Sequence, residues 1–192
     1  MTDDSLIIAN NISYKINENK LFHNLSFDIK GGSALHIKGK NGSGKSTLLR
    51  IILGITDPTK GSIYSAASLQ ICYLGHKNAL KNYLTIRDNI HLMQLNNHIK
   101  LNKYLDLIGL KRHLDVTVSS LSFGQQKKLA LLRVFLNSSN LLILDEPFVG
   151  LDDDTHEQLT QFLSNELIIG KGLIFTSHIP CQIKSHLLEL DS

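Results

Sequence analysis

Apolar residues in the first third of the chain occur in short alternating or continuous runs, the pattern of β-strands. Strands are predicted over residues 5–10 and 20–29, with the polar segment 15–20 as the turn between them. A glycine turn at 31–32 leads into a short strand that ends at Gly39. A helix is predicted to begin at Lys45 and to stop at Gly54, followed by a turn over 56–62 and a buried strand over 69–75.

Beyond residue 79 the apolar positions recur every three or four residues, which predicts a helical block that extends to Asn137. The apolar run "LLILD" at 141–145 then predicts a buried strand of the parallel type. A helix over 154–170 and a last strand over 172–178 follow. Strand–helix alternation interrupted by helices predicts an α/β core with a helical insertion, and a chain of 192 residues suits a single domain.

Composition and charge limit the possible partners and the compartment of the protein, but they do not identify its function. Lys and Arg number 20 against 17 Asp and Glu, a net charge of +3, which is compatible with a nucleotide or an anionic membrane surface but argues against a nucleic-acid-binding tail. No signal peptide or membrane-spanning stretch is expected. Cys72 and Cys181 are isolated, without metal or haem-attachment spacing, so a reducing compartment is expected.

A glycine-rich segment between a predicted strand and a predicted helix contains the first motif that indicates a chemical function. It matches G-x-x-x-x-G-K-[ST] and comprises Gly39, Lys40, Asn41, Gly42, Ser43, Gly44, Lys45, Ser46 and Thr47. Glycines allow backbone N–H groups to turn inward around phosphates, while the lysine reaches the β- and γ-phosphates and Ser46 offers its hydroxyl to Mg²⁺. This motif alone does not distinguish a transporter ATPase from a kinase or a GTPase.

Acidic residues follow the central predicted strand in "LLILDEP". Ligands of open α/β sheets bind at the carboxyl ends of the strands, so Asp145 and Glu146 are expected beside the phosphates. Asp145 is the expected partner of Mg²⁺, through water, and Glu146 can orient the attacking water and accept its proton. His178 ends the next strand, where it can hydrogen-bond the γ-phosphate.

A second helix start with the features of an anion site occurs at "LSFGQQKKLALLRVFL", residues 121–136. Ser122 and Gln125 form the pattern of a capping box, and Gly124 keeps the entrance open. Leu129, Leu132 and Leu136 recur behind them at helical spacing. Lys127 and Lys128 are expected on an exposed face of this helix rather than in a nucleic-acid-binding patch.

These motifs, together with "GLD" at Gly150–Asp152 and "SH" at Ser177–His178, resemble in order and spacing those of the ATP-binding-cassette (ABC) ATPases. The resemblance implies a P-loop NTPase core with a helical subdomain at about 79–137, and ATP with Mg²⁺ as cofactors. It further implies a head-to-tail homodimer in which Ser122, Gly124 and Gln125 of one chain hold the γ-phosphate of the ATP bound by the other. Asp152 would then communicate across the interface, and Tyr14 would stack on adenine.

Within that family, the "YLGH" segment, the "LSFGQ" signature and the short stretch after His178 resemble the ATP-binding subunits of haem exporters in cytochrome c maturation. His76 stands where most of the family has a glutamine that binds Mg²⁺; imidazole is a poor ligand for this hard cation. The resemblance implies a peripheral subunit on the cytoplasmic face of the membrane, bound to integral membrane subunits that handle haem themselves. A transporter of another small solute, a soluble cassette ATPase in DNA repair or on ribosomes, and a nucleotide-binding module without turnover are the alternatives.

Overall fold

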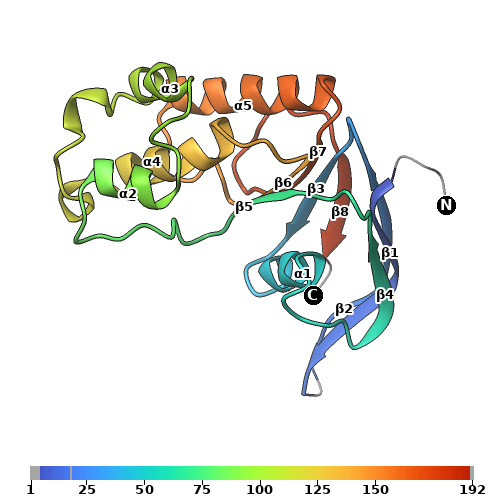
Figure 1. Ribbon diagram of the computed structural model, residues 1–192. Helices are drawn as coiled ribbons and strands as arrows, with labels where there is room; N and C mark the ends of the chain where they lie inside the picture. Colours follow the sequence, from blue (N-terminus) through green and yellow to red (C-terminus); the bar gives the residue numbers. More distant parts are fainter. Residues whose placement is uncertain (1–4, 18, 191–192) are drawn as a thin grey trace.

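The computed structural model describes residues 5–17 and 19–190, and it divides into two sheets and a helical end (Figure 1). An antiparallel sheet contains β2 (Asn19–Lys30), β1 (Ser5–Ile16) and β4 (Lys60–Ser65), in that order. A parallel sheet has the order β5 (Ile71–Leu74), β6 (Leu141–Asp145), β7 (Gly172–Thr176), β3 (Ala34–Gly39) and β8 (His186–Leu190). Helix α1 (Lys45–Ile52) lies near the antiparallel sheet, and α5 (Asp153–Ile168) lies on the other side of the parallel sheet (Figure 1).

The helical end, on the left of Figure 1, is formed mainly by the block between β5 and β6. It contains α2 (Ile86–Leu92), α3 (Leu101–Leu107), the 3₁₀ turns η1 (Lys111–His113) and η2 (Val118–Ser120), and α4 (Phe123–Phe135). Thr85 and Asp88 form a capping box at the start of α2, which explains where this helix begins. The helices thus lie inside the predicted block, although the first of them begins at Ile86, several residues after the position expected.

Side chains of the parallel sheet point alternately into two cores, as the two-residue period of a strand requires. Leu142 and Leu144 of β6 pack into the core shared with α2–α5, whereas Leu141 and Ile143 pack into the core shared with α1 and the antiparallel sheet. All five residues of β6 are buried, as are those of β7. The prediction of a buried parallel strand at 141–145 is therefore confirmed.

Three predictions of elements were wrong in part. The segment 56–62, predicted as a turn, enters strand β4 at Lys60, because the backbone of β1 offers an antiparallel partner that the exposed residues of β4 do not reveal. The strand ending near His178 is not the last one, since β8 follows and pairs in parallel with β3. Strands β1 and β2 also extend through most of the predicted turn 15–20, so that Asn17 turns with a φ of 54°; Glu18 lies outside the described residues.

Candidate functional site

The glycine-rich loop connects β3 to α1 and closes over the start of that helix. Gly42 and Gly44 adopt φ angles of 87° and 97°, in the left-handed region that glycine enters without a steric penalty. The Lys45 side chain folds back over the loop, and its Nζ donates hydrogen bonds to the carbonyls of Gly39 at 2.7 Å and Lys40 at 3.0 Å. A turn of backbone N–H groups, a helix start and an ammonium group thus converge, which is the arrangement that binds phosphate.

Asp145 lies at the carboxyl end of β6 and is held from two sides. The hydroxyl of Ser46 donates to its Oδ2 at 2.9 Å, and the hydroxyl of Thr176 donates to its Oδ1 at 2.8 Å. Asp145 is 3% exposed and Thr176 is fully buried. The strand end and the phosphate-binding loop are therefore locked together through one carboxylate.

Thr176 also fixes the next residue, because its Oγ1 accepts a hydrogen bond from the Glu146 backbone N–H at 2.9 Å. Glu146 has a φ of 50°, a conformation that costs a non-glycine residue about 1–2 kcal/mol. The strained backbone aims the carboxylate toward His178, whose own backbone N–H donates to Glu146 Oε2 at 3.2 Å. No sequence motif identified Thr176; its position directly before "SH", at the end of a buried strand, was the available signal.

His178 is the more exposed member of this pair. Its ring Nε2 lies 3.3 Å from Glu146 Oε1, and the His178 side chain is 53% exposed while that of Glu146 is 10% exposed. The carboxylate can therefore act as a shielded base, while the imidazole reaches into the open space of the pocket. This geometry suits the two roles predicted for them.

A pocket of about 570 Å³ unites these groups. It is lined by Ile16, Leu21, Asn41, Gly42, Gly44, Lys45, Ser46, Thr47, His76, Asp145, Glu146, Val149 and His178. Tyr14, the residue expected to stack on adenine, is absent from this lining; it lies in β1 and packs against Phe22, with ring centroids 6.2 Å apart. Ile16 and Leu21 provide the apolar wall instead, because β1 and β2 run on beyond Tyr14 and carry these residues to the pocket.

The donors in the pocket fit a hard cation that keeps most of its water. The Ser46 hydroxyl and the Asp145 carboxylate are both oxygen donors, and they are already in contact at 2.9 Å. Among residues 5–17 and 19–190, no three His, Cys, Asp or Glu side chains form a cluster that could bind a metal.

The second helix start has the predicted capping box. The Ser122 hydroxyl accepts a hydrogen bond from the Gln125 backbone N–H at 3.2 Å, and the Gln125 side chain accepts one from the Ser122 backbone N–H at 2.9 Å. A Cβ at Gly124 would lie 2.5 Å from the carbonyl oxygen of Gly150, so only glycine fits there. Ser122, Gly124 and Gln125 do not line the pocket described above.

Asp152 connects α4, the helix of this second site, to the start of α5. It caps α5 by accepting a hydrogen bond from the Thr155 backbone N–H at 3.0 Å, and it pairs with Lys128 Nζ at 2.6 Å. Hydrogen bonds from Lys128 and Thr155 lower the pKa of the Asp152 carboxyl to about 2. The Asp152 side chain is 59% exposed, so water screens this pair and its contribution to stability is small.

Lys127 corrects the expectation of an exposed basic helix face. Only 2% of this residue is exposed, and it is among the largest fully buried side chains of the described chain. Burial lowers the pKa of its ammonium group, while the nearby charges of Asp145 and Glu146 oppose that shift. Its neighbour Lys128 is partly covered as well, because it pairs with Asp152.

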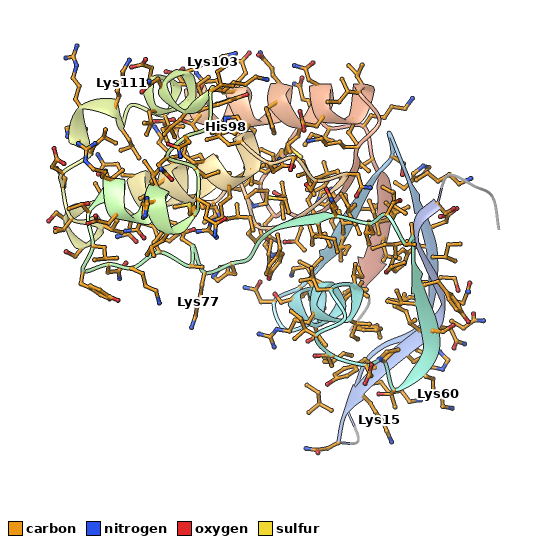
Figure 2. The ribbon with its side chains drawn as sticks, viewed as in Figure 1. Lys15, Lys60, Lys77, His98, Lys103 and Lys111 are labelled. Carbon is orange, nitrogen blue, oxygen red and sulfur yellow. The ribbon has the colours of Figure 1, made fainter. Side chains whose placement is uncertain are left out.

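Other lysines project from the two ends of the molecule (Figure 2). Lys103 and Lys111 project from the helical end, while Lys15 and Lys60 project from the antiparallel sheet at the opposite end (Figure 2). None of the helices within the described residues combines the length and the apolar character needed to cross a bilayer.

Comparison with known proteins adds family and fold. A family model described as "ABC transporter" matches residues 22–149. The cytochrome c biogenesis ATP-binding export protein CcmA of Salmonella typhi is 32% identical over 185 residues, which cover 91% of this chain and 90% of that protein. CcmA of Sodalis glossinidius is 34% identical over 184 residues, covering 88% and 87% respectively.

The fold is likewise found among solved structures. A dimeric ATP-binding cassette in a post-hydrolysis state, bound to ADP and Pi, superposes with a TM-score of 0.80 at 24% identity, covering 96% of this chain and 94% of the other. At that identity the similarity concerns the fold alone. The predicted α/β core of P-loop type is confirmed.

Proposed function

Because the chain belongs to the ABC transporter family, we propose that it is the ATP-hydrolysing subunit of a membrane export complex that serves cytochrome c biogenesis. The observation that carries this proposal is the convergence of Lys45, Ser46, Asp145, Glu146 and His178 on one pocket. The names of relatives that match along about nine tenths of the chain support the biogenesis role.

The residues divide the chemistry of hydrolysis between them. The loop N–H groups and Lys45 bind the phosphates, while Glu146 accepts the proton of the attacking water. His178 donates a hydrogen bond to the γ-phosphate, where charge develops as the bond breaks. Mg²⁺, held by the Ser46 hydroxyl and through water by Asp145, would neutralise phosphate charge. His76 also lines the pocket and would not ligate the cation, because imidazole is a poor ligand for it.

The proposed working unit is a head-to-tail homodimer. Ser122, Gly124 and Gln125 lie outside the pocket of their own chain, yet Ser122 is exposed at a helix start suited to an anion. In the dimer they complete the γ-phosphate site of the other chain. Asp152 links that helix, through Lys128, to the start of α5, and in this proposal it communicates between the two sites.

The dimer is proposed to act on the cytoplasmic face of the membrane, beneath integral membrane subunits. ATP closure would move the helical block, about residues 79–137, against loops of those subunits. That motion would drive export of haem or its release from a membrane-tethered carrier, with haem itself handled by the partners.

Two variants distinguish ATP hydrolysis from ATP binding. Glu146→Gln should abolish ATP turnover while ATP still binds and holds a dimer, because the base is lost but the phosphate loop is intact. Lys45→Ala should weaken ATP binding itself. ATPase rates, nucleotide titration and light scattering measure these outcomes, and turnover at the wild-type rate in Glu146→Gln would contradict the proposal.

The biological role has its own test. The source cell carrying Lys45→Ala should lack mature c-type cytochromes in a haem stain, whereas the wild-type gene should restore them. Normal levels of these cytochromes would refute the biogenesis role and would favour transport of another solute, without affecting the ATPase assignment.

A further inference from the structure

His36 is a half-buried polar residue on β3, the strand next to the edge of the parallel sheet, and it lies outside every motif described above. It lies on β3, in register with Phe175 on β7 and Leu187 on β8. Its ring stacks on the fully buried Phe175 ring, with centroids 4.3 Å apart and planes inclined by 17°. Such a strand position usually holds an aliphatic side chain, so the imidazole needs an explanation beyond packing.

Among the described residues, the His36 ring makes one hydrogen bond, and this bond leads to the pair formed by Glu146 and His178. His36 Nε2 lies 3.2 Å from the carbonyl oxygen of Ser177. A carbonyl oxygen can only accept, so Nε2 must carry the proton. The same peptide group continues with the N–H of His178, which donates to Glu146 Oε2 at 3.2 Å.

One planar peptide therefore has both ends occupied, its C=O by His36 and its N–H by Glu146. Hydrogen bonds in such a chain polarise one another, and each strengthens its neighbour by roughly a tenth to a third. Burial lowers the pKa of His36, against the effect of its hydrogen bond to Ser177; the titratable groups Lys38, Glu146 and His178 act on it more weakly. The ring is therefore a neutral donor at physiological pH.

We propose that His36 is a positioning residue for ATP hydrolysis, which acts through the Ser177–His178 peptide to hold the Glu146 carboxylate in place. The inference rests on the proposed role of Glu146 as the base. By fixing the Ser177 carbonyl, His36 orients the His178 N–H toward the Glu146 carboxylate. It also fixes the position of the His178 backbone, from which the imidazole side chain extends. A displaced carboxylate would face the water at a poorer angle, so the effect belongs to the chemical step rather than to nucleotide binding.

Two variants separate this role from packing. His36→Phe keeps an aromatic ring against Phe175 but cannot donate, whereas His36→Gln loses the ring but carries an amide N–H at a similar reach. We expect kcat to fall by about 2- to 12-fold in His36→Phe, the range of one net hydrogen bond, with KM and the Kd for ATP unchanged. His36→Gln should recover most of the lost rate.

His186→Phe is the matched control, because it makes the same substitution at an exposed position of β8, the strand beside β3. It should retain the wild-type rate. If His36→Phe also retains the wild-type kcat, or if both His36 variants lose the same activity, the ring has only a packing role and the inference is wrong.

The hydrogen bond can also be observed in the wild-type protein. Long-range ¹⁵N–¹H correlation of ¹⁵N-labelled histidine rings, with the His36 signals assigned by their loss in His36→Gln, should show the Nε2–H tautomer. The Nδ1–H tautomer would overturn the inference even if His36→Phe failed to fold. Glu146→Gln, measured in the same series, separates the failure of the proposed base from the failure of the role of His36. Full activity of Glu146→Gln would refute the proposed base. An inactive Glu146→Gln together with an unaffected His36→Phe would refute only the role of His36.

Discussion

Thr176→Val tests the buried hydroxyl that holds the acidic strand end. Valine has nearly the shape of threonine, so packing is preserved, but two hydrogen bonds are lost: the one donated to Asp145 Oδ1 at 2.8 Å and the one accepted from the Glu146 N–H at 2.9 Å. Thr176 is 0% exposed, so water cannot replace either bond.

The expected loss of stability in Thr176→Val follows from the partners of these two hydrogen bonds. A hydrogen bond to a charged group contributes about 1.5–3 kcal/mol, and an unsatisfied buried N–H costs about 1–3 kcal/mol. Because both bonds share one oxygen and Ser46 still holds the other carboxylate oxygen, we expect their joint loss to lower the free energy of unfolding by about 3 kcal/mol.

Thr176→Ser is the complementary variant, since it keeps the hydroxyl and removes only a methyl group. Its cost should be about 1 kcal/mol. Urea unfolding followed by far-UV circular dichroism measures both variants. With a denaturant slope of about 2 kcal/mol/M, the midpoint should fall by about 1.5 M for Thr176→Val and about 0.5 M for Thr176→Ser.

The reverse order, with Thr176→Ser less stable than Thr176→Val, would refute this reasoning. It would mean that the methyl group stabilises the strand end and that the hydroxyl contributes little.

Three further predictions concern charge. Lys127→Met should unfold at a higher urea midpoint than the wild type at pH 7, because burial lowers the pKa of Lys127 in the folded protein. The difference should shrink as the pH rises toward and above the ordinary lysine pKa of about 10.4, where the lysine of the unfolded chain loses its proton. Asp152→Asn should lose about 0.5 kcal/mol of stability at pH 7, since the cap remains and only an exposed ion pair is removed. The pKa of Asp152 is about 2 in the folded protein, below its ordinary value, so the wild type loses the contribution of this carboxylate as the pH falls from 4 to 2. The Asn variant lacks that carboxylate and should lose less stability than the wild type over the same interval. His76→Gln should leave ATP affinity within about twofold by fluorescent-nucleotide titration, less than the net contribution of one hydrogen bond; a tenfold change in affinity would contradict the view that His76 does not ligate the cation.

Local chemistry was predictable from the sequence. Ser122 and Gln125 form their capping box because both partners lie within one turn of the same helix. Gly42 and Gly44 adopt left-handed angles that a glycine-rich spacing indicates. The position of Asp145 beside Ser46 also followed from the sequence, since parallel strands deliver their carboxyl ends to one edge of the sheet.

Features that depend on distant partners were not predictable in the same way. Lys127 looks like a surface residue in its helix, and only the packing of α4 against the strand end that bears Asp145 and Glu146 buries it. Strand β4 has no buried residue, so its apolar pattern is weak and its pairing with β1 decides its conformation. The roles of Thr176 and His36 arise from hydrogen bonds between neighbouring strands, which no local pattern reports.

The central claim is that each ATP site is completed by the Ser122 helix start of a second chain, and mixing two inactive variants tests it most directly. Lys45→Ala damages the phosphate loop, and Ser122→Arg blocks the helix start; each homodimer carries its lesion at both sites. In a mixed dimer, one site carries both lesions and the other is intact. Equal mixing should restore up to about a quarter of the wild-type ATPase rate, since half of the dimers are mixed and each has one working site of two. No recovered activity, with mixed dimers verified by differently tagged chains, would contradict the account.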